Sequence, residues 1–315
     1  MAQENIQDWL VVVNPNAGVG KGLKDWKKIS QLLDQAGFSY QSVFTQKPLH
    51  AMTITIEKIQ DGFRKIIVVG GDGTMNEVVN GIFKQNTTFA DSISLGMISV
   101  GTGNDWGRTF NIPSDYEKAI EVISKENTTL QDAGLVKYFY DGCEKTRYFI
   151  NMAGLGFDGL VAQKTKQDKE KGNTSFLVYL KNLVASLFSY QSTNIRLIVD
   201  GREINQKIFS IGIAIGQYNG GGMRQAPKAL TDDGLFDLVL INHMSKWSVV
   251  ANVRRLYDGS IGKFKKVETM TAKTITIDST PAILMEIDGE SMGLSPFEFR
   301  IVPKSIKVIT NKKKH

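Results

Sequence analysis

The residues best suited to chemistry lie in one stretch, residues 68–79, which reads Val-Val-Gly-Gly-Asp-Gly-Thr-Met-Asn-Glu-Val-Val. The run before it, residues 66–69, is β-branched throughout, as in a strand buried on both faces of a parallel sheet. Gly70, Gly71 and Gly73 allow positive φ angles and let a large anion approach the backbone N–H groups. A strand, a glycine turn and a helix start in this order predict a phosphate-binding site, because free amides and the helix dipole point to one place.

Asp72 lies inside this predicted phosphate site. A carboxylate there repels a phosphate unless it also binds a metal ion or a hydroxyl group, so we predict that Asp72 is catalytic or linked to magnesium. The alternative is that Asp72 only caps the turn. Thr74 is predicted to be the N-cap of the following helix, with Glu77 completing a capping box.

A second glycine loop, residues 14–22, follows the short apolar run at residues 10–13. It resembles a P-loop but fails the motif, because Pro15 stands where the first glycine belongs and Gly22 replaces the Ser or Thr after the lysine. A third loop, residues 101–108, follows the run at 95–100 and carries Asp105. Loops at the carboxyl ends of parallel strands converge on one crevice, so we expect Asp72 and Asp105 to share a site.

The elements that must position these loops alternate between strand and helix over residues 8–125, which predicts a three-layer α/β domain. Helical spacing of apolar residues predicts a helix over residues 25–35, and residues 40–44 are typical of a strand. Ser114 and Glu117 predict a capping box for a helix after Pro113.

Short alternating strands dominate from about residue 131, which predicts a β-sandwich or a partly closed barrel. The predicted strands cover residues 148–152, 195–199, 208–215, 236–241, 274–277 and 283–287, and Asp200-Gly201 is a hairpin signal. Apolar residues at helical spacing predict a helix over 174–190, which either covers a sheet edge or lines an apolar pocket. The lysine-rich residues 164–171 are interpreted as a solvated, mobile segment.

Composition is that of a globular protein of one or two domains, with 315 residues, 42% hydrophobic and 22% charged. A net charge of +6 favours an anionic partner such as a nucleotide or a phospholipid surface, although a basic surface alone explains it as well. A single cysteine excludes an internal disulfide and fits a reducing compartment. No signal peptide or membrane span is recognised, so we expect a cytoplasmic protein, at most peripheral at the inner surface of the membrane.

Two further features of the second half carry carboxylates on turns or loops. Residues 220–234 contain three consecutive glycines and the pair Asp232-Asp233, and Asp288-Gly289-Glu290 follows a predicted strand. An Asp-Gly turn is common for structural reasons alone. It gains interest here because a phosphoryl acceptor needs a group that takes its proton.

Taken together, these residues resemble the diacylglycerol kinase catalytic family, in particular the soluble bacterial lipid kinases related to diacylglycerol and sphingosine kinases. The resemblance runs in family order across nearly the whole chain, through Asn14-Pro15-Asn16-Ala17-Gly18, Thr45 with His50-Ala51, Gly70 to Thr74 with Asn76-Glu77, Gly101 to Asp105, Asn151 with Gly154, Gly156-Phe157-Asp158, the 220–234 block and Asp288-Gly289-Glu290. The blocks in the second half separate the chain from NAD kinases and phosphofructokinases, which share the Gly-Gly-Asp-Gly motif.

The resemblance implies an ATP-binding α/β domain at residues 1–130 and 297–315, and a lipid-binding β-sandwich domain at 131–296. The last strands, around residues 297–309, are expected to return to the first domain. It also implies the ligands of each site. ATP is expected at Asn14, Pro15, Asn16, Ala17, Gly18, Thr45, Gly71, Asp72, Gly73, Thr74, Met75, Asn76, Glu77, Thr102 and Asp105.

By the same resemblance, magnesium is the expected cofactor, held by Asp233 and by the main-chain oxygens of Leu230 and Leu235. Glu290 matches the family's proton acceptor, with Asp288 beside it as the alternative, and Asp72 joins them as a catalytic residue. The expected reaction is transfer of the γ-phosphoryl group of ATP to a lipid hydroxyl, such as that of diacylglycerol, in the cleft between the domains.

Two alternatives stay open at this point: a kinase for a soluble acceptor, as in NAD kinases, and a nucleotide-regulated lipid-binding protein without turnover. Contact with an anionic membrane is an open expectation, and no nucleic acid partner is expected. The sequence does not identify the acceptor lipid.

Overall fold

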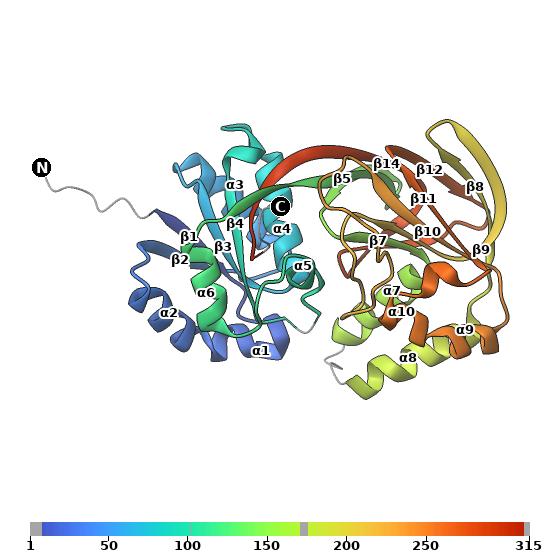
Figure 1. Ribbon diagram of the computed structural model, residues 1–315, viewed down its shortest axis with the longest axis horizontal. Coiled ribbons are helices and arrows are strands. Elements are labelled where there is room, and N and C mark those ends of the chain that lie inside the picture. The colour runs from blue at the N-terminus through green and yellow to red at the C-terminus, as the bar shows by residue number, and fades with distance from the viewer. Residues whose placement is uncertain (1–7, 102, 171–175, 312–315) are drawn as a thin grey trace, which may run out of the picture. The chain divides into compact units, whose positions relative to one another are not determined.

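A computed structural model describes residues 8–101, 103–170 and 176–311, with the backbone alone for residues 169, 170 and 176–182 (Figure 1). The chain divides into two compact units. Unit 1 comprises Met1–Gln131 and Lys304–His315, and unit 2 comprises Asp132–Pro303. Thr102, a predicted ATP contact, and Lys171, the last residue of the lysine-rich segment 164–171, lie outside the described residues.

Unit 1 is built on a parallel sheet with the strand order β4-β3-β1-β2. Its strands are β1 (Trp9–Val13), β2 (Tyr40–Phe44), β3 (Lys65–Gly70) and β4 (Ser94–Ser99). Consecutive residues of β1 and β3, such as Val12 and Val13, are fully buried, because helices cover both faces of the sheet.

The helices of unit 1 lie in two layers, one on each face of this sheet (Figure 1). They are α1 (Ala17–Lys24), α2 (Trp26–Gln35), α3 (His50–Gln60), α4 (Asp72–Lys84), α5 (Asp105–Thr109), α6 (Tyr116–Ser124) and the 3-10 turn η1 (Ala90–Ser92). Ile29 of α2 and Ile120 of α6 pack with Val13 on one face, and α3 and α4 pack together on the other. The predicted three-layer α/β domain is confirmed.

The predicted start of α6 is wrong in detail. Its N-cap is Asp115, whose carboxylate accepts the Lys118 N–H at 3.0 Å. Ser114 and Glu117 therefore form no capping box, because the neighbouring aspartate supplies the acceptor one residue later.

Unit 2 is a β-rich domain, as predicted. Its strands are β5 (Thr128–Tyr140, which begins in unit 1), β6 (Cys143–Phe149), β7 (Met152–Gly156), β8 (Thr193–Val199), β9 (Arg202–Ala214), β10 (Phe236–Asn242), β11 (Val267–Ala272), β12 (Thr274–Ser279), β13 (Leu284–Ile287) and β14 (Glu290–Ile309). Antiparallel pairing runs from β9 through β8, β12, β14, β13 and β7 back to β9, so these six strands form a closed circuit. Phe149, Phe236 and Phe297 belong to the apolar core of this unit.

β14 is a single strand of 20 residues that belongs to both units. Its first part pairs with β13 and β12, whereas Lys307 and Val308 pair in parallel with Ser94 and Leu95 of β4. The expected return of the last strands to the first domain is confirmed.

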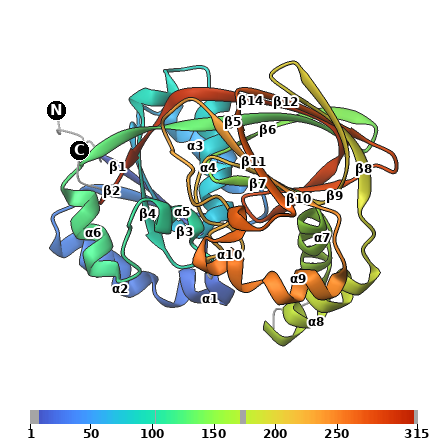
Figure 2. The same ribbon diagram turned by 45° about the vertical axis from the view of Figure 1, so that its right-hand side comes forward.

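The helices of unit 2 are α7 (Phe157–Glu170), α8 (Phe176–Ser189), α9 (Lys246–Asn252), α10 (Arg254–Asp258) and the 3-10 turn η2 (Ile261–Lys263), shown from a second direction in Figure 2. The predicted helix over 174–190 is observed as α8 from Phe176 to Ser189, and residues 174 and 175 lie outside the described residues. Residues 164–170, part of the segment interpreted as solvated and mobile, continue α7 as a helix.

Candidate functional site

The loops that follow β1, β3 and β4 meet at the carboxyl edge of the parallel sheet, as the sequence predicts. Gly18 has a φ angle of +60°, and a Cβ there would lie 2.0 Å from the carbonyl oxygen of Val100. A Cβ on Gly101 would lie 2.7 Å from the Cα of Gly71. The backbones of the three loops therefore pack against one another at a distance that only glycine allows.

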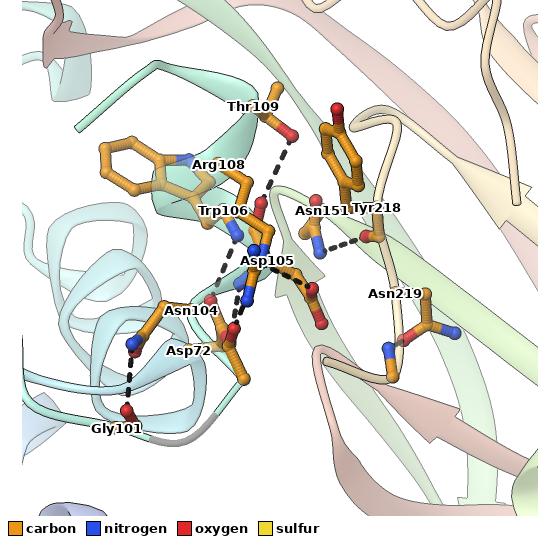
Figure 3. A network of polar contacts seen from close by, with 12 residues as sticks. Asp72, Gly101, Asn104, Asp105, Trp106, Arg108, Thr109, Asn151, Tyr218 and Asn219 are labelled. Atoms are coloured by element: carbon orange, nitrogen blue, oxygen red, sulfur yellow. Dashed lines mark hydrogen bonds and ion pairs between the residues drawn. The ribbon is translucent and has the colours of Figure 1, made fainter. Parts of the chain in front are cut away.

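Asp72 holds two of these loops together (Figure 3). Its Oδ2 accepts the backbone N–H of Asp105 at 3.1 Å, and its Oδ1 accepts that of Trp106 at 3.1 Å. Because these amides open helix α5, the carboxylate also lies at the positive end of that helix. The structure thus gives Asp72 a capping contact, but to a helix 33 residues further along the chain rather than to its own turn.

Helix α4 begins at Asp72, so the prediction that Thr74 is its N-cap is wrong. The N-cap is Gly71, and no side chain caps the helix. The first helical bond runs from the Met75 N–H to the Gly71 carbonyl oxygen at 3.0 Å, so the N–H groups of Gly73 and Thr74 have no acceptor within the helix. These amides, at the N-terminus of a helix of 13 residues, are the groups that a phosphate would bind.

Asn14 joins the first glycine loop to α4. Its Nδ2 donates to the Thr74 hydroxyl at 2.8 Å, and its Oδ1 accepts the Asn16 N–H at 3.0 Å. Asn16 itself is exposed, and Pro15, Ala17 and Gly18 are partly exposed. The loop is therefore partly open to solvent, and Asn14 fixes its start.

Glu77 does not take part in a capping box of its own helix, because Thr74 is not the N-cap. Its two carboxylate oxygens instead accept the N–H groups of Leu49 and Ala51, at 2.9 and 3.1 Å, which caps helix α3. Four other residues predicted to contact ATP are buried in unit 1: Thr45, Thr74, Met75 and Asn76.

Asp105 is 5% exposed, and its Oδ1 lies 3.7 Å from the Nε of Arg108. The next residue, Trp106, is 1% exposed and donates its indole N–H to the side chain of Gln131 at 3.0 Å. This hydrogen bond explains why a tryptophan suits this buried position, which the sequence did not reveal. Asp105 and Asp72 come together as predicted, through the backbone N–H of Asp105.

In unit 2, Asp288 and Gly289 form the tight turn between β13 and β14, with φ angles of +46° and +86°. The Asp288 carboxylate is 5% exposed and accepts the backbone N–H groups of Ile150, Asn151 and Met152 at 3.2, 3.1 and 3.0 Å. These contacts explain why the predicted strand over 148–152 is wrong: the amides turn toward the carboxylate, and the chain divides there into β6 and β7.

Glu290 is the exposed carboxylate of this turn. It opens β14 opposite Ile287, so its backbone is fixed by the ladder while its side chain stays in solvent. An exposed carboxylate in this setting is available to accept a proton from an acceptor hydroxyl.

Glu286 is a buried acid that the sequence reasoning missed. It is 4% exposed, accepts the Gly289 N–H at 2.8 Å, and has the Asn219 side-chain amide at 3.3 Å. Burial, with a smaller effect from the charge of Asp158, raises the pKa of Glu286 to about 8. A Cβ on Gly154 would lie 2.6 Å from its Oε1, so a glycine in the facing strand makes room for this acid.

Burial also raises the pKa of Asp158, which accepts a hydrogen bond from the Ser210 hydroxyl at 2.7 Å. The sequence offered one signal for this pair, the Gly-Phe-Asp block at 156–158, but no role for the acid. The alternation in β13 suggested the opposite for Glu286, because a polar residue between Met285 and Ile287 normally faces solvent.

In the loop predicted to bind magnesium, Leu230, Asp232 and Asp233 are exposed, and Asp132 holds the loop at Thr231 and Gly234. The Asp132 N–H donates to the Thr231 carbonyl at 2.7 Å, and its Oδ2 accepts the Gly234 N–H at 2.7 Å. Asp233 is exposed and uses Oδ1 to accept the Leu235 N–H at 3.0 Å. Its charge, together with burial as the larger cause, raises the pKa of Asp237 to about 6.

Among the described residues, no group of three or more His, Cys, Asp or Glu side chains is arranged to hold a metal ion. A magnesium site in this loop would therefore combine Asp233 with main-chain carbonyl oxygens, such as those of Leu230 and Leu235. Magnesium prefers oxygen ligands and keeps several waters, so this donor set fits the ion.

Comparison with known proteins assigns both halves of the chain. Residues 8–136 match the family model described as "Diacylglycerol kinase catalytic domain", and residues 151–310 match "YegS C-terminal NAD kinase beta sandwich-like domain". The protein named "Putative lipid kinase YtlR" of Bacillus subtilis (strain 168) is 31% identical over 96% of this chain and 99% of its own length.

A protein of Staphylococcus carnosus (strain TM300) named "Diacylglycerol kinase" is 28% identical over 96% of this chain and 94% of its own length. Among solved structures, a crystal structure from Bacillus anthracis str. Sterne titled as a putative diacylglycerol kinase superposes with a TM-score of 0.77. It is 23% identical and the match covers 97% of this chain and 95% of the other, so it supports the fold.

Proposed function

The chain belongs to the diacylglycerol kinase family of lipid kinases, and we propose that it transfers the γ-phosphoryl group of ATP to the hydroxyl group of diacylglycerol or a related lipid alcohol. The observation that carries the proposal is the carboxyl edge of the unit 1 sheet. There, the backbones of three glycine loops pack closely together, and the N-terminus of α4 leaves the N–H groups of Gly73 and Thr74 without an acceptor in the helix, which is what a triphosphate needs.

The reaction forms a bond between the γ-phosphorus and the acceptor oxygen, breaks the bond to the bridging oxygen of ADP, and releases the hydroxyl proton. Such a transfer requires mainly positioning and neutralisation of charge. In our proposal the amides of Gly73 and Thr74 bind phosphate oxygens, and Asp72 keeps the loop that carries Asp105 in place for that binding.

Glu290 is the residue that we propose takes the hydroxyl proton. Two other carboxylates lie at or near the same turn, but Asp288 is buried with three backbone N–H donors on it, and Glu286 has a pKa of about 8 and is protonated at neutral pH. Glu290 alone among these three carboxylates is exposed to solvent. This comparison favours Glu290 over Asp288 as the base.

Magnesium is proposed as the cofactor, bound by Asp233 and the main-chain oxygens of Leu230 and Leu235. The ion would supply positive charge that neutralises nearby carboxylates and phosphate oxygens. Asp232 and Asp233 are adjacent exposed carboxylates in this loop, which favours a cation there. Diacylglycerol is proposed as acceptor because a relative that matches almost the whole chain carries that name.

The test is transfer of the labelled γ-phosphoryl group of ATP to lipid, followed by extraction into organic solvent. Glu290→Gln removes the base and leaves the fold unchanged, so turnover should fall about a hundredfold or more while the melting temperature stays the same. Glu298→Gln, an exposed change on the same strand, serves as the matched control. Wild-type turnover in Glu290→Gln would remove Glu290 from the mechanism, and label confined to the aqueous phase would indicate a soluble acceptor.

A further inference from the structure

Helices α8, α9 and α10 of unit 2 carry a set of exposed apolar side chains, which we call the α8–α10 face. Its members are Val184 (47% exposed), Phe188 (53%), Trp247 (73%), Val250 (49%), Val253 (41%) and Tyr257 (56%). Large apolar residues with such exposure normally occur singly on a soluble protein. A concentration of six on three short helices marks a surface that binds something.

The spacing of these residues places them on common stripes. Val184 and Phe188 are four residues apart on α8, so they lie on one side of that helix. Val253 is the C-cap of α9 and the N-cap of α10 with helical backbone angles, so the two helices run on almost without a break. Trp247, Val250, Val253 and Tyr257 follow at intervals of three and four and therefore form one stripe along both.

The opposite sides of the same helices are apolar as well. Leu187, Val249 and Leu256 pack in the core cluster that lies beneath these helices. A helix that is apolar on two sides is usually covered on both sides, because exposing apolar side chains to water is unfavourable. The inner side is covered by unit 2, and the outer side is the α8–α10 face.

Direct contacts join α8 to α9. The rings of Phe188 and Trp247 meet edge to face with their centroids 6.1 Å apart. The Lys246 ammonium donates to the carbonyl oxygens of Phe188 and Tyr190 at the end of α8, the latter at 2.8 Å. Both views place the two helices side by side (Figures 1 and 2), so their exposed apolar residues form one surface.

The charge around this surface is strongly positive. Residues 241–266, which contain α9 and α10, carry six lysines and arginines against one aspartate, whereas the net charge of the whole chain is +6. Five of those six net charges thus lie in 26 residues beside the α8–α10 face. Lys263, Lys265 and Lys266 are exposed.

A cavity of about 320 Å³ opens beside the N-terminus of α9. Lys207, His243 and Lys246 line it together with Tyr190, Phe209 and Met244. Cationic groups next to aromatic and aliphatic walls suit an amphipathic anion, with its charged part at the lysines and its apolar part against the rings.

We propose that the α8–α10 face docks on an anionic phospholipid bilayer, with Trp247 and Phe188 at the level of the headgroups and the lysines of residues 241–266 against the lipid phosphates. Aromatic residues with a basic surround are the signature of helices that lie in the membrane interface. No helix among the described residues is long and apolar enough to cross a membrane. α8, with 14 residues, reaches about 21 Å, less than the roughly 30 Å hydrocarbon core.

The test is binding of the full chain to phosphatidylglycerol vesicles and to phosphatidylcholine vesicles by sedimentation, without ATP or acceptor lipid. We expect binding to the anionic vesicles that weakens with salt, and at least tenfold weaker binding to the neutral ones. Trp247→Ala should weaken anionic binding by about tenfold or more, whereas Phe89→Ala, which removes an even more exposed aromatic (83%) from unit 1, should change it less than twofold. Lys265→Gln should weaken it about fivefold, as expected for one cation worth about 1 kcal/mol.

A second readout follows Trp247 itself, because the other three tryptophans, Trp9, Trp26 and Trp106, are buried or partly buried. Lipids that carry a fluorescence quencher should quench the wild type and leave Trp247→Phe unaffected. Equal binding by Trp247→Ala and the wild type, or equal binding to both vesicle types, would overturn the proposal. So would a wild-type dimer that Trp247→Ala dissociates without any change in vesicle binding, because the face would then be a protein interface. The vesicle assay involves no phosphoryl transfer, so an absence of vesicle binding would not contradict the proposed kinase function. Equally, an absence of kinase activity would not contradict the proposed membrane binding.

Discussion

Replacing Glu286 by glutamine should change the pH dependence of stability in a defined direction. The acid has a pKa of about 8 in the folded protein against an ordinary 4.5, because it is buried and lies near Asp158. Between pH 4.5 and about pH 8, the Glu286 carboxyl therefore keeps its proton in the folded state and has lost it in the unfolded state. The resulting stabilisation is complete below about pH 4.5 and is lost as the pH rises through about 8.

The size of the effect follows from the two pKa values. Between about pH 5.5 and about pH 8.5, proton linkage at Glu286 should lower the free energy of unfolding by about 3 kcal/mol. Glutamine stays neutral at every pH in this range and can keep the Gly289 N–H as donor to its carbonyl oxygen. Glu286→Gln should thus be close to the wild type in stability at the lower pH and more stable than it by about 3 kcal/mol at the higher one.

The assay is urea-induced unfolding followed by far-ultraviolet circular dichroism at both pH values. Because other groups also titrate, the informative quantity is the difference between variant and wild type, which isolates position 286. Glu144→Gln, the same change at an exposed glutamate of β6, should show almost no such difference. A wild-type protein whose stability relative to Glu286→Gln is the same at both pH values would refute the assignment of Glu286 as a neutral buried acid.

Three more predictions concern the nucleotide and metal sites. Gly101→Ala should weaken ATP binding, measured by calorimetry, by at least about tenfold, because the new Cβ would lie 2.7 Å from the backbone of the neighbouring loop. The control is Gly262→Ala, whose Cβ would meet only a methyl group at 3.6 Å and which should bind ATP normally. Asp72→Asn leaves one side-chain oxygen for two N–H donors, so the free energy of unfolding should fall by about 1–3 kcal/mol, which a lower melting temperature would show. The same variant should lose lipid phosphorylation, and near wild-type turnover would contradict this. Asp233→Asn should raise the magnesium concentration for half-maximal activity about tenfold, while the neighbouring exposed Asp232→Asn should not, and equal behaviour of the two would exclude Asp233 as a ligand.

Three strands of the unit 1 sheet, β1, β3 and β4, could be predicted from the sequence because they are buried on both faces. Such strands consist of short apolar runs such as the one at residues 66–69, and a glycine-containing loop follows each of the three. The Asp288-Gly289 turn was equally visible, since few other residue pairs adopt two consecutive positive φ angles.

The capping partners could not be predicted, because local rules consider only residues three positions apart. Asp72 caps a helix whose first residue is Asp105, and Glu77 caps the helix that begins at His50. Both contacts depend on tertiary structure that brings distant loops together. A sequence motif such as Thr74 with Glu77 therefore identified residues that matter but assigned them the wrong partners.

Strand periodicity alone also does not reveal an acid that faces another layer of protein. Glu286 alternates with apolar neighbours and reads as a solvent-facing residue, yet unit 2 closes around that face and buries it beside Asp158. The long strand β14 was recognised only in part, because one strand serves both units and its pattern changes where it passes from one to the other.

The most direct test of the proposed function is mass spectrometry of the organic phase after incubation with ATP, magnesium and a total lipid extract. A lipid kinase should produce a lipid that is heavier than an acceptor in the extract by one phosphoryl group, and this product should be absent with Glu290→Gln and present with Glu298→Gln. A protein that consumes ATP without forming any phosphorylated lipid, or that forms the same product equally well without the Glu290 carboxylate, would contradict the account.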